Sequence, residues 1–174
     1  MRHLRIFSLS LVLLLLLASA AAATAFTFRS GVTWDTTPAQ MLAAEGRQAG
    51  DDTYNRHTYN GYTFYYLWNR GEKTEDVYYV FVGEAPVMAY TLVQGGDFAA
   101  AQEQMAARYG APADVSKETV SRLQNALIPS STLPTDFSAL AAWRLADGTL
   151  AALFTINGET YRAYFHQQRI PGGM

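Results

Sequence analysis

The chain contains no cysteine among its 174 residues. This absence excludes disulfide bonds, thiolate nucleophiles and cysteine-ligated metals. Histidine is also scarce. After the N-terminal segment only His57 and His166 remain, at unrelated points and without H-x-H or H-E-x-x-H spacing. We therefore predict no metal site and no cofactor.

Other catalytic signatures are missing as well. There is no G-x-S-x-G elbow, and Gly95-Gly96 precedes the acidic Asp97, which disfavours a phosphate-binding loop. Asp51-Asp52 with Asn55 does not have the spacing of a calcium-binding EF-hand loop. We predict no catalytic residues and a non-enzymatic protein. A hydrolase is the least favoured alternative, because carboxylate pairs leave no spacing rule in a sequence.

A positive charge excess is absent outside the first residues. Removing Arg2 and Arg5 leaves 11 basic residues against 15 acidic ones, a formal net charge of −4. Such a chain has no basic footprint for nucleic acid, so we expect no nucleic-acid partner.

The longest apolar run is at the N-terminus, where Arg2 and Arg5 precede the stretch 6–18. Small residues follow, and Ala23-Thr24-Ala25 fits the pattern for cleavage before Phe26. We predict a Sec signal peptide over residues 1–25 and a secreted or periplasmic, envelope-associated bacterial protein. The run is short for a membrane span. No later segment is long enough to span a membrane.

The remaining chain suits a single domain over residues 26–169 followed by a short tail, 170–174. Its first helix is predicted at Thr37-Pro38-Ala39-Gln40, a capping box with proline at the first helical position, and ends at Gly46. Residues 47–60 are polar and are interpreted as a loop. Residues 59–68 alternate mostly between aromatics, which predicts a strand buried on or near both sides.

The most apolar stretch after the N-terminus is 77–93, interpreted as a hairpin around Gly83-Glu84-Ala85-Pro86 with its tip at Glu84-Ala85. This turn pairs the bulky residues of one face as Phe81 with Met88, Tyr79 with Tyr90 and Val77 with Leu92. Its other face is smaller but still apolar: Tyr78, Val80, Val82, Val87, Ala89 and Thr91.

Two further helices are predicted after Gly95-Gly96. Asp97 caps the first, which ends at Gly110 and Pro112. Ser116 caps the second, whose apolar stripe is Val120, Leu123 and Leu127.

Asp147-Gly148 and Asn157-Gly158 then predict two tight hairpins. Two-residue loops pair Leu145 with Leu150, Trp143 with Ala152, Phe154 with Tyr161, and Leu150 with Phe165, all on one inner face. The opposite face is then largely polar, with Arg144, Thr155, Thr160, Arg162, Tyr164 and His166.

These elements predict an α+β domain built of tandem α-βββ units, 26–94 and 95–169. Antiparallel meander strands would form one sheet or two, with the helices packed on one side.

Two segments resemble a known class. Thr33-Trp34-Asp35-Thr36-Thr37-Pro38-Ala39-Gln40-Met41 is similar to the segment that opens the first helix of small exported proteins of the outer-membrane-assembly lipoprotein (BamE/SmpA-like) and β-lactamase-inhibitor-protein-like class. Arg108-Tyr109-Gly110-Ala111-Pro112 is similar to the end of their helix. Asp35-Thr36 stands where that class has Gly-Met. The resemblance implies a non-enzymatic protein-binding scaffold, with no catalytic residues carried over.

The chain after residue 25 has 22 Phe, Tyr and Trp residues. This number is larger than a single hydrophobic core easily buries. Because Tyr and Trp dominate interfaces, we predict a module that binds another protein. The alternative is a glycan or small ligand held by Tyr62, Tyr66 and Trp68. Tyr78 is a further candidate. A weaker hypothesis makes Arg144, Arg162 and Tyr164, with His166, a patch for anions or an acidic partner. Burial in the core and a solvated sheet face are the structural alternatives to these roles.

Overall fold

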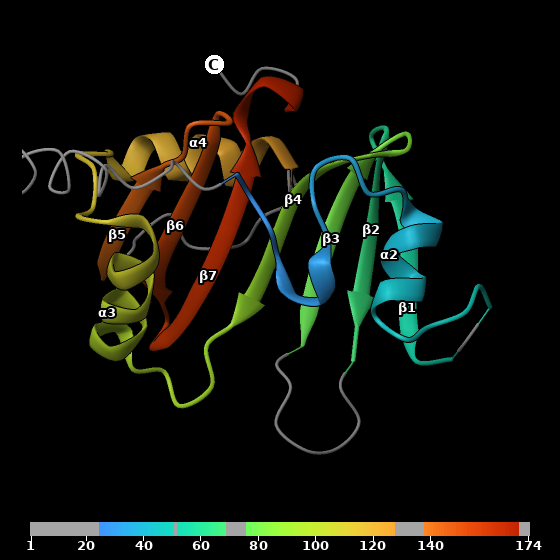
Figure 1. Ribbon diagram of the computed structural model, residues 1–174, viewed down its shortest axis with the longest axis horizontal. Helices are drawn as coiled ribbons and strands as arrows, with labels where there is room; N and C mark the ends of the chain where they lie inside the picture. Colours follow the sequence, from blue (N-terminus) through green and yellow to red (C-terminus); the bar gives the residue numbers. More distant parts are fainter. Residues whose placement is uncertain (1–24, 51, 69–75, 128–137, 171–174) are drawn as a thin grey trace, which may run out of the picture.

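A single seven-stranded antiparallel sheet organises the computed structural model, which describes residues 25–50, 52–68, 76–127 and 138–170 (Figure 1). The strand order is β1-β2-β3-β4-β7-β6-β5, so the two halves of the chain join where β4 pairs with β7. The strands are β1 Tyr54–Tyr59, β2 Tyr62–Leu67, β3 Val77–Val82, β4 Ala85–Leu92, β5 Ala139–Arg144, β6 Thr149–Ile156 and β7 Glu159–His166. The α+β class and the antiparallel meander are confirmed.

The division into equal α-βββ units differs from the structure. The first half has four strands, because β1 lies in the region that we interpreted as a loop. Asn60 (φ 49°) and Gly61 (φ 80°) make the tight turn from β1 into β2. This Asn-Gly pair was the hairpin signal for β1. The polar composition of β1 concealed it, since β1 is an edge strand in which five of the six residues are exposed.

Local helix signals are confirmed. In α2 (Pro38–Ala44) the Thr37 hydroxyl accepts from Gln40 N–H, and Thr37 N–H donates to the Gln40 side chain. Asp97 caps α3 (Phe98–Tyr109), and Ser116 accepts from Thr119 N–H at the start of α4 (Lys117–Leu127). The 3₁₀ turns η1 (Arg29–Gly31) and η2 (Gln167–Arg169) are short additions. The side chains of Leu123 and Leu127 lie outside the described residues, as do the predicted signal peptide through residue 24, Asp51, and residues 69–75, 128–137 and 171–174.

The helices do not all pack on one side, which corrects that part of the prediction. Figure 1 shows α2 and α3 in front of the sheet, with the N-terminal segment crossing between them, and α4 behind it. Met41 and Leu42 of α2 and Ala101 and Met105 of α3 belong to one buried cluster. Val120 of α4 belongs to a second cluster on the opposite face.

The β5–β6 turn has three residues, not two. Leu145 N–H donates to Thr149 O across Ala146-Asp147-Gly148, and Gly148 has φ +81°. The extra residue moves the register by one, so Trp143 pairs with Ala151 and Arg144 pairs with Leu150. A shift of one residue turns every side chain to the other face. The predicted pairs Leu145–Leu150 and Trp143–Ala152 were therefore wrong.

The Asn157-Gly158 turn is the two-residue turn that was predicted. Phe154 pairs with Tyr161 and Leu150 pairs with Phe165. The opposite face of β6 and β7, however, is not a solvated surface. Thr160 and Tyr164 are buried there, and Tyr164 packs in one cluster with residues of the N-terminal segment and α3. The Thr160 hydroxyl donates to Gly96 O at 2.8 Å, which satisfies its polar group.

A β-bulge between Val80 and Phe81 changes the β3–β4 hairpin. The turn residues are Gly83 and Glu84, and Phe81 pairs with Pro86 while Tyr79 pairs with Ala89 and Val77 with Thr91. The predicted pairs Tyr79–Tyr90 and Val77–Leu92 were therefore wrong by one residue, and Phe81–Met88 was wrong by two. Ala89 consequently joins the face of Tyr79, while Met88 and Tyr90 join the face of Tyr78 and Val80.

Candidate functional site

An aromatic ladder crosses the far face of the sheet. We use this name for Trp68, Tyr66, Tyr78 and Tyr90. Tyr66 pairs with Tyr78 across β2 and β3, and Tyr78 pairs with Tyr90 across β3 and β4. Residues opposite each other on neighbouring strands hold their side chains close together on one face. The sheet register therefore builds the ladder directly.

The rings of the ladder are closely stacked. The Tyr66 and Tyr78 centroids are 4.4 Å apart at 18°, and those of Tyr78 and Tyr90 are 4.3 Å apart at 2°. Trp68 meets Tyr66 edge to face at 5.1 Å. All four residues are partly exposed. Because stacked rings cover one another's faces, the middle of the ladder presents ring edges and hydroxyl groups to its surroundings.

Acidic side chains adjoin both ends of the ladder. The Tyr66 hydroxyl donates to Asp76 Oδ2 at 2.5 Å. At the other end Tyr161, on β7, donates to Glu159 and stacks on Phe154 at 5.8 Å. The surroundings of the ladder therefore combine aromatic edges, phenol groups and two carboxylates.

The phenol groups of the ladder resist ionisation. Burial raises the pKa of Tyr66 well above 10, and the hydrogen bond to Asp76 raises it further. Burial raises the pKa of Tyr90 as well, and the neighbouring hydroxyls of Tyr78, Tyr161 and Tyr66 add to this effect. The ladder hydroxyls are thus protonated at neutral pH and able to donate hydrogen bonds.

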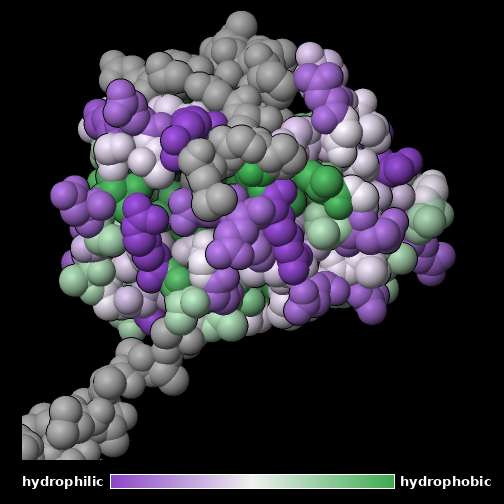
Figure 2. Space-filling view, turned by 90° about the horizontal axis from the view of Figure 1, so that it is seen from above, coloured by the Kyte–Doolittle hydropathy of each residue, from purple (hydrophilic) through white to green (hydrophobic). Residues whose placement is uncertain are grey.

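The far face is not covered uniformly. In Figure 1, α4 crosses it near the end at which β7 finishes. The register places Tyr66, Tyr78 and Tyr90 near the end of β2, the start of β3 and the end of β4. Seen from above, at the end near α4, hydrophobic residues are visible only in small areas between hydrophilic ones (Figure 2).

The structure brings three of the sequence-predicted residues together in the ladder, namely Tyr66, Trp68 and Tyr78. Tyr62 is separate, because it is buried at the other end of β2, where it pairs with Val82. Sequence reasoning placed Tyr90 with Tyr79, since the bulge was not recognised. The bulge alone puts Tyr90 into the ladder.

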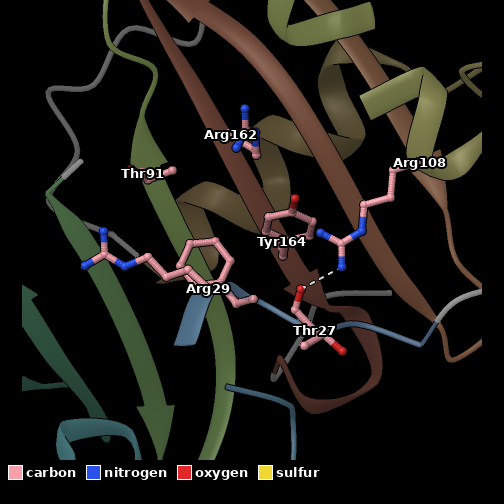
Figure 3. Close-up of a pocket in the computed structure, with 7 residues that line it drawn as sticks. Thr27, Arg29, Thr91, Arg108, Arg162 and Tyr164 are labelled. Atoms are coloured by element: carbon pink, nitrogen blue, oxygen red, sulfur yellow. Dashed lines mark hydrogen bonds between the residues drawn. The ribbon is translucent and has the colours of Figure 1, made fainter. Parts of the chain in front are cut away.

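A second group of polar residues surrounds a cavity of about 230 Å³ on the opposite face (Figure 3). The cavity is lined by Thr27, Phe28, Arg29, Thr91, Arg108, Arg162 and Tyr164. Figure 3 shows Arg162 and Tyr164 projecting from β7, with Arg108 reaching from α3 toward Thr27. Arg108 donates to Thr27 O at 3.1 Å.

Two of the predicted patch residues, Arg162 and Tyr164, therefore share one cavity. Arg144 is exposed on β5, 3.5 Å from Gln167 Oε1, and does not line it. His166 does not line it either and instead contacts Trp34 edge to face at 5.4 Å. Arg29 and Arg108 also line the cavity but were not among the predicted patch residues. No local sequence pattern indicates that the N-terminal segment and α3 pack against β7.

Within the described parts of the chain, no group of three His, Asp or Glu side chains is placed to hold a metal ion. Among the same residues, no helix has the length and apolar character needed to cross a membrane. Comparison with protein-family models, with curated proteins and with solved structures finds no match for this chain.

Proposed function

We propose that this protein is a non-enzymatic module that binds another protein through the aromatic ladder. The observation that supports this proposal is the row of aromatic rings on one sheet face: cross-strand pairing stacks Tyr66, Tyr78 and Tyr90, and Trp68 meets Tyr66 edge to face. Tyr and Trp supply large contact areas at low entropic cost and are enriched among the residues that dominate binding energy.

The ladder favours a flat partner surface over a sugar. A glycan stacks on the open face of an aromatic ring, whereas each face of Tyr78 is covered by a neighbouring ring at 4.3–4.4 Å. Asp76 and Glu159 adjoin the stack, so the partner surface should combine apolar groups with Lys or Arg side chains. Glycan binding by Trp68 and Tyr66 is the second candidate.

The N-terminal sequence supports export to the periplasm or beyond, and the helix-cap resemblance to exported binding scaffolds agrees with a non-enzymatic role. Partners are therefore sought among envelope and secreted proteins. A signal peptide, export and binding belong to one proposal and are tested together.

The test begins with a pull-down from the envelope and culture supernatant of the producing cells, using immobilised protein without residues 1–25. Each captured protein is identified, purified and titrated against the wild-type chain and against Trp68→Ala and Tyr78→Ala. The matched control is Tyr59→Ala, since Tyr59 is 48% exposed on β1 and outside the ladder. Circular dichroism confirms that every variant is folded.

The proposal expects a partner whose affinity falls at least about tenfold in both ladder variants and stays unchanged in Tyr59→Ala. Equal affinity for all variants would exclude the ladder as the binding surface. Failure to recover any partner, together with ladder-dependent binding on a glycan array, would replace the protein partner with a glycan.

A further inference from the structure

The cavity in Figure 3 has an excess of positive charge. Three of its seven lining residues are arginines, and none is acidic. Arg29 is neutralised from outside the cavity, since its Nη2 lies 2.9 Å from Glu45 Oε2. Within the described residues, neither Arg108 nor Arg162 forms an ion pair with a carboxylate.

Arg162 is the most unusual of these groups. Its Nε is buried and has no hydrogen-bond partner among the described atoms. Among the described residues, its Nη2 has one long hydrogen bond, 3.5 Å to Gln104 Oε1. A buried donor without an acceptor is unfavourable, and such groups in native proteins call for an explanation. A bound acceptor would supply the missing partner.

We propose that this cavity binds a small oxyanion, a carboxylate or phosphate group, through the guanidinium groups of Arg108 and Arg162. Guanidinium groups present donors in a planar fork that matches carboxylate and phosphate oxygens. Tyr164 lines the cavity beside them, and its hydroxyl keeps its proton because burial raises its pKa well above 10. Phe28 supplies an apolar wall for the body of a small organic anion.

The site is independent of the aromatic ladder, which lies on the other face of the sheet. Titration calorimetry with inorganic phosphate and with succinate, at ionic strength held constant with chloride, measures the binding. We expect saturable binding of one equivalent and a rise in melting temperature, as linkage requires. Arg162→Gln and Arg108→Gln should each weaken binding by about tenfold or more.

Arg144→Gln is the matched control, because it removes the same charge from an exposed position outside the cavity. It should leave the affinity unchanged, as should the ladder variant Tyr78→Ala. Two results would overturn the proposal: no saturable binding of either anion to wild type, or equal weakening by Arg162→Gln and Arg144→Gln. The second result would indicate general charge screening.

A different observation concerns the start of the folded chain. Phe26 is only 2% exposed, and its ring stacks on Trp34 with centroids 3.9 Å apart. Its backbone N–H donates to Asp147 Oδ2 at 2.7 Å, while Asp147 Oδ1 accepts from Thr149 N–H at 3.0 Å. Phe26 is also the residue that directly follows the predicted cleavage site.

We infer that processing places a new charge opposite Asp147. Hydrolysis of the Ala25–Phe26 bond by a signal peptidase consumes one water, leaves a carboxylate on Ala25 and leaves an amine on Phe26 that takes up a proton. The resulting Phe26 ammonium group forms an ion pair with Asp147. This ion pair stabilises the packing of the N-terminal segment against the β5–β6 turn. A charge-assisted hydrogen bond is stronger than the hydrogen bond from a neutral backbone amide that it replaces.

Two measurements test this inference. The intact mass of the exported protein should correspond to a chain that begins at Phe26. In a double-mutant cycle, Asp147→Asn is compared in a chain starting at Phe26 and in one extended by a short N-terminal peptide ending in Ala25. The substitution should shift the folding equilibrium about tenfold more in the chain with the free Phe26 amine.

A mature N-terminus at another residue would refute the inference. An equal effect of Asp147→Asn in both chains would do so too, since the carboxylate would then act only as an acceptor for a backbone amide. Neither outcome bears on partner binding by the ladder.

Discussion

Alkaline pH should unfold this protein cooperatively, because much of its polar core consists of phenol groups. Seven of its 11 tyrosines have a raised pKa, and burial is the largest cause in each case. The hydroxyls of Tyr79, Tyr90 and Tyr164 are the most enclosed. Tyr79 also donates to Glu45 Oε1 at 2.6 Å, where a phenolate would face a carboxylate.

The direction in which pH changes the stability follows from proton linkage. A tyrosine whose pKa is higher in the folded state keeps its proton there after the unfolded chain has lost it. Its contribution to the unfolding free energy is therefore complete at pH values below 10.0, the pKa in the unfolded chain. That contribution is lost as the pH rises toward the pKa in the folded state. Each such group lowers the unfolding free energy by about 1.4 kcal/mol per pH unit within that interval.

Counting only the three most enclosed hydroxyls, the unfolding free energy should fall by about 4 kcal/mol per pH unit above pH 10. A domain with about 8 kcal/mol of stability would then unfold near pH 12. Arg108 and Arg162 lower the pKa of Tyr164 in part, but burial outweighs them.

Urea unfolding at several values between about pH 9 and pH 11.5 measures this slope directly. Tyr79→Phe removes one of the three groups and should reduce the slope by about a third, although it also lowers stability at neutral pH. In a direct titration, the tyrosinate absorbance of the buried phenols should appear together with the loss of far-ultraviolet circular dichroism. Complete tyrosinate formation in a protein with native circular dichroism would refute the reasoning.

Three smaller predictions follow from single contacts. Thr149→Val removes the acceptor of the buried Trp34 indole N–H at 2.7 Å and should cost about 1–3 kcal/mol in urea unfolding; unchanged stability would show that the indole finds another acceptor. Burial, and to a lesser extent Arg169, lower the pKa of His166 below 6.5, although Asp147 and Asp35 oppose this effect. The stability of the fold should therefore decrease as the pH drops below about 6.5. In thermal unfolding, His166→Gln should make the stability less dependent on pH in this range. Gly158→Ala should cost about 1–2 kcal/mol through its φ of +82° alone, because no atom lies within 4 Å of the added methyl; a larger loss would point to a clash.

Local sequence signals determined much of the fold. The capping residues Thr37, Asp97 and Ser116 placed three helices, because a cap acts on the backbone within one turn. Asn157-Gly158 placed the β6–β7 turn with its register for the same reason. Alternation along residues 59–68 also predicted a strand buried on or near both sides, and β2 contributes Tyr65 and Leu67 to one cluster and Tyr62 to the other.

The strand register, and which sheet face each side chain occupies, depended on the tertiary structure. One additional residue in the Asp147-Gly148 turn and one bulge at Val80–Phe81 each moved a strand by one position, which reversed the faces of Trp143 and Ala89. Local composition did not reveal either shift, because both faces of these strands are apolar.

The two candidate sites depended on contacts that are distant in the sequence. The aromatic ladder needs three paired strands in the bulged register, and the arginine-lined cavity needs α3 and the N-terminal segment packed against β7. The sequence alone determined that the chain is rich in aromatics, poor in catalytic signatures and able to form these elements. Only the tertiary structure decided which side chains meet, because a residue's face and cover are set by pairing and packing across the whole sheet.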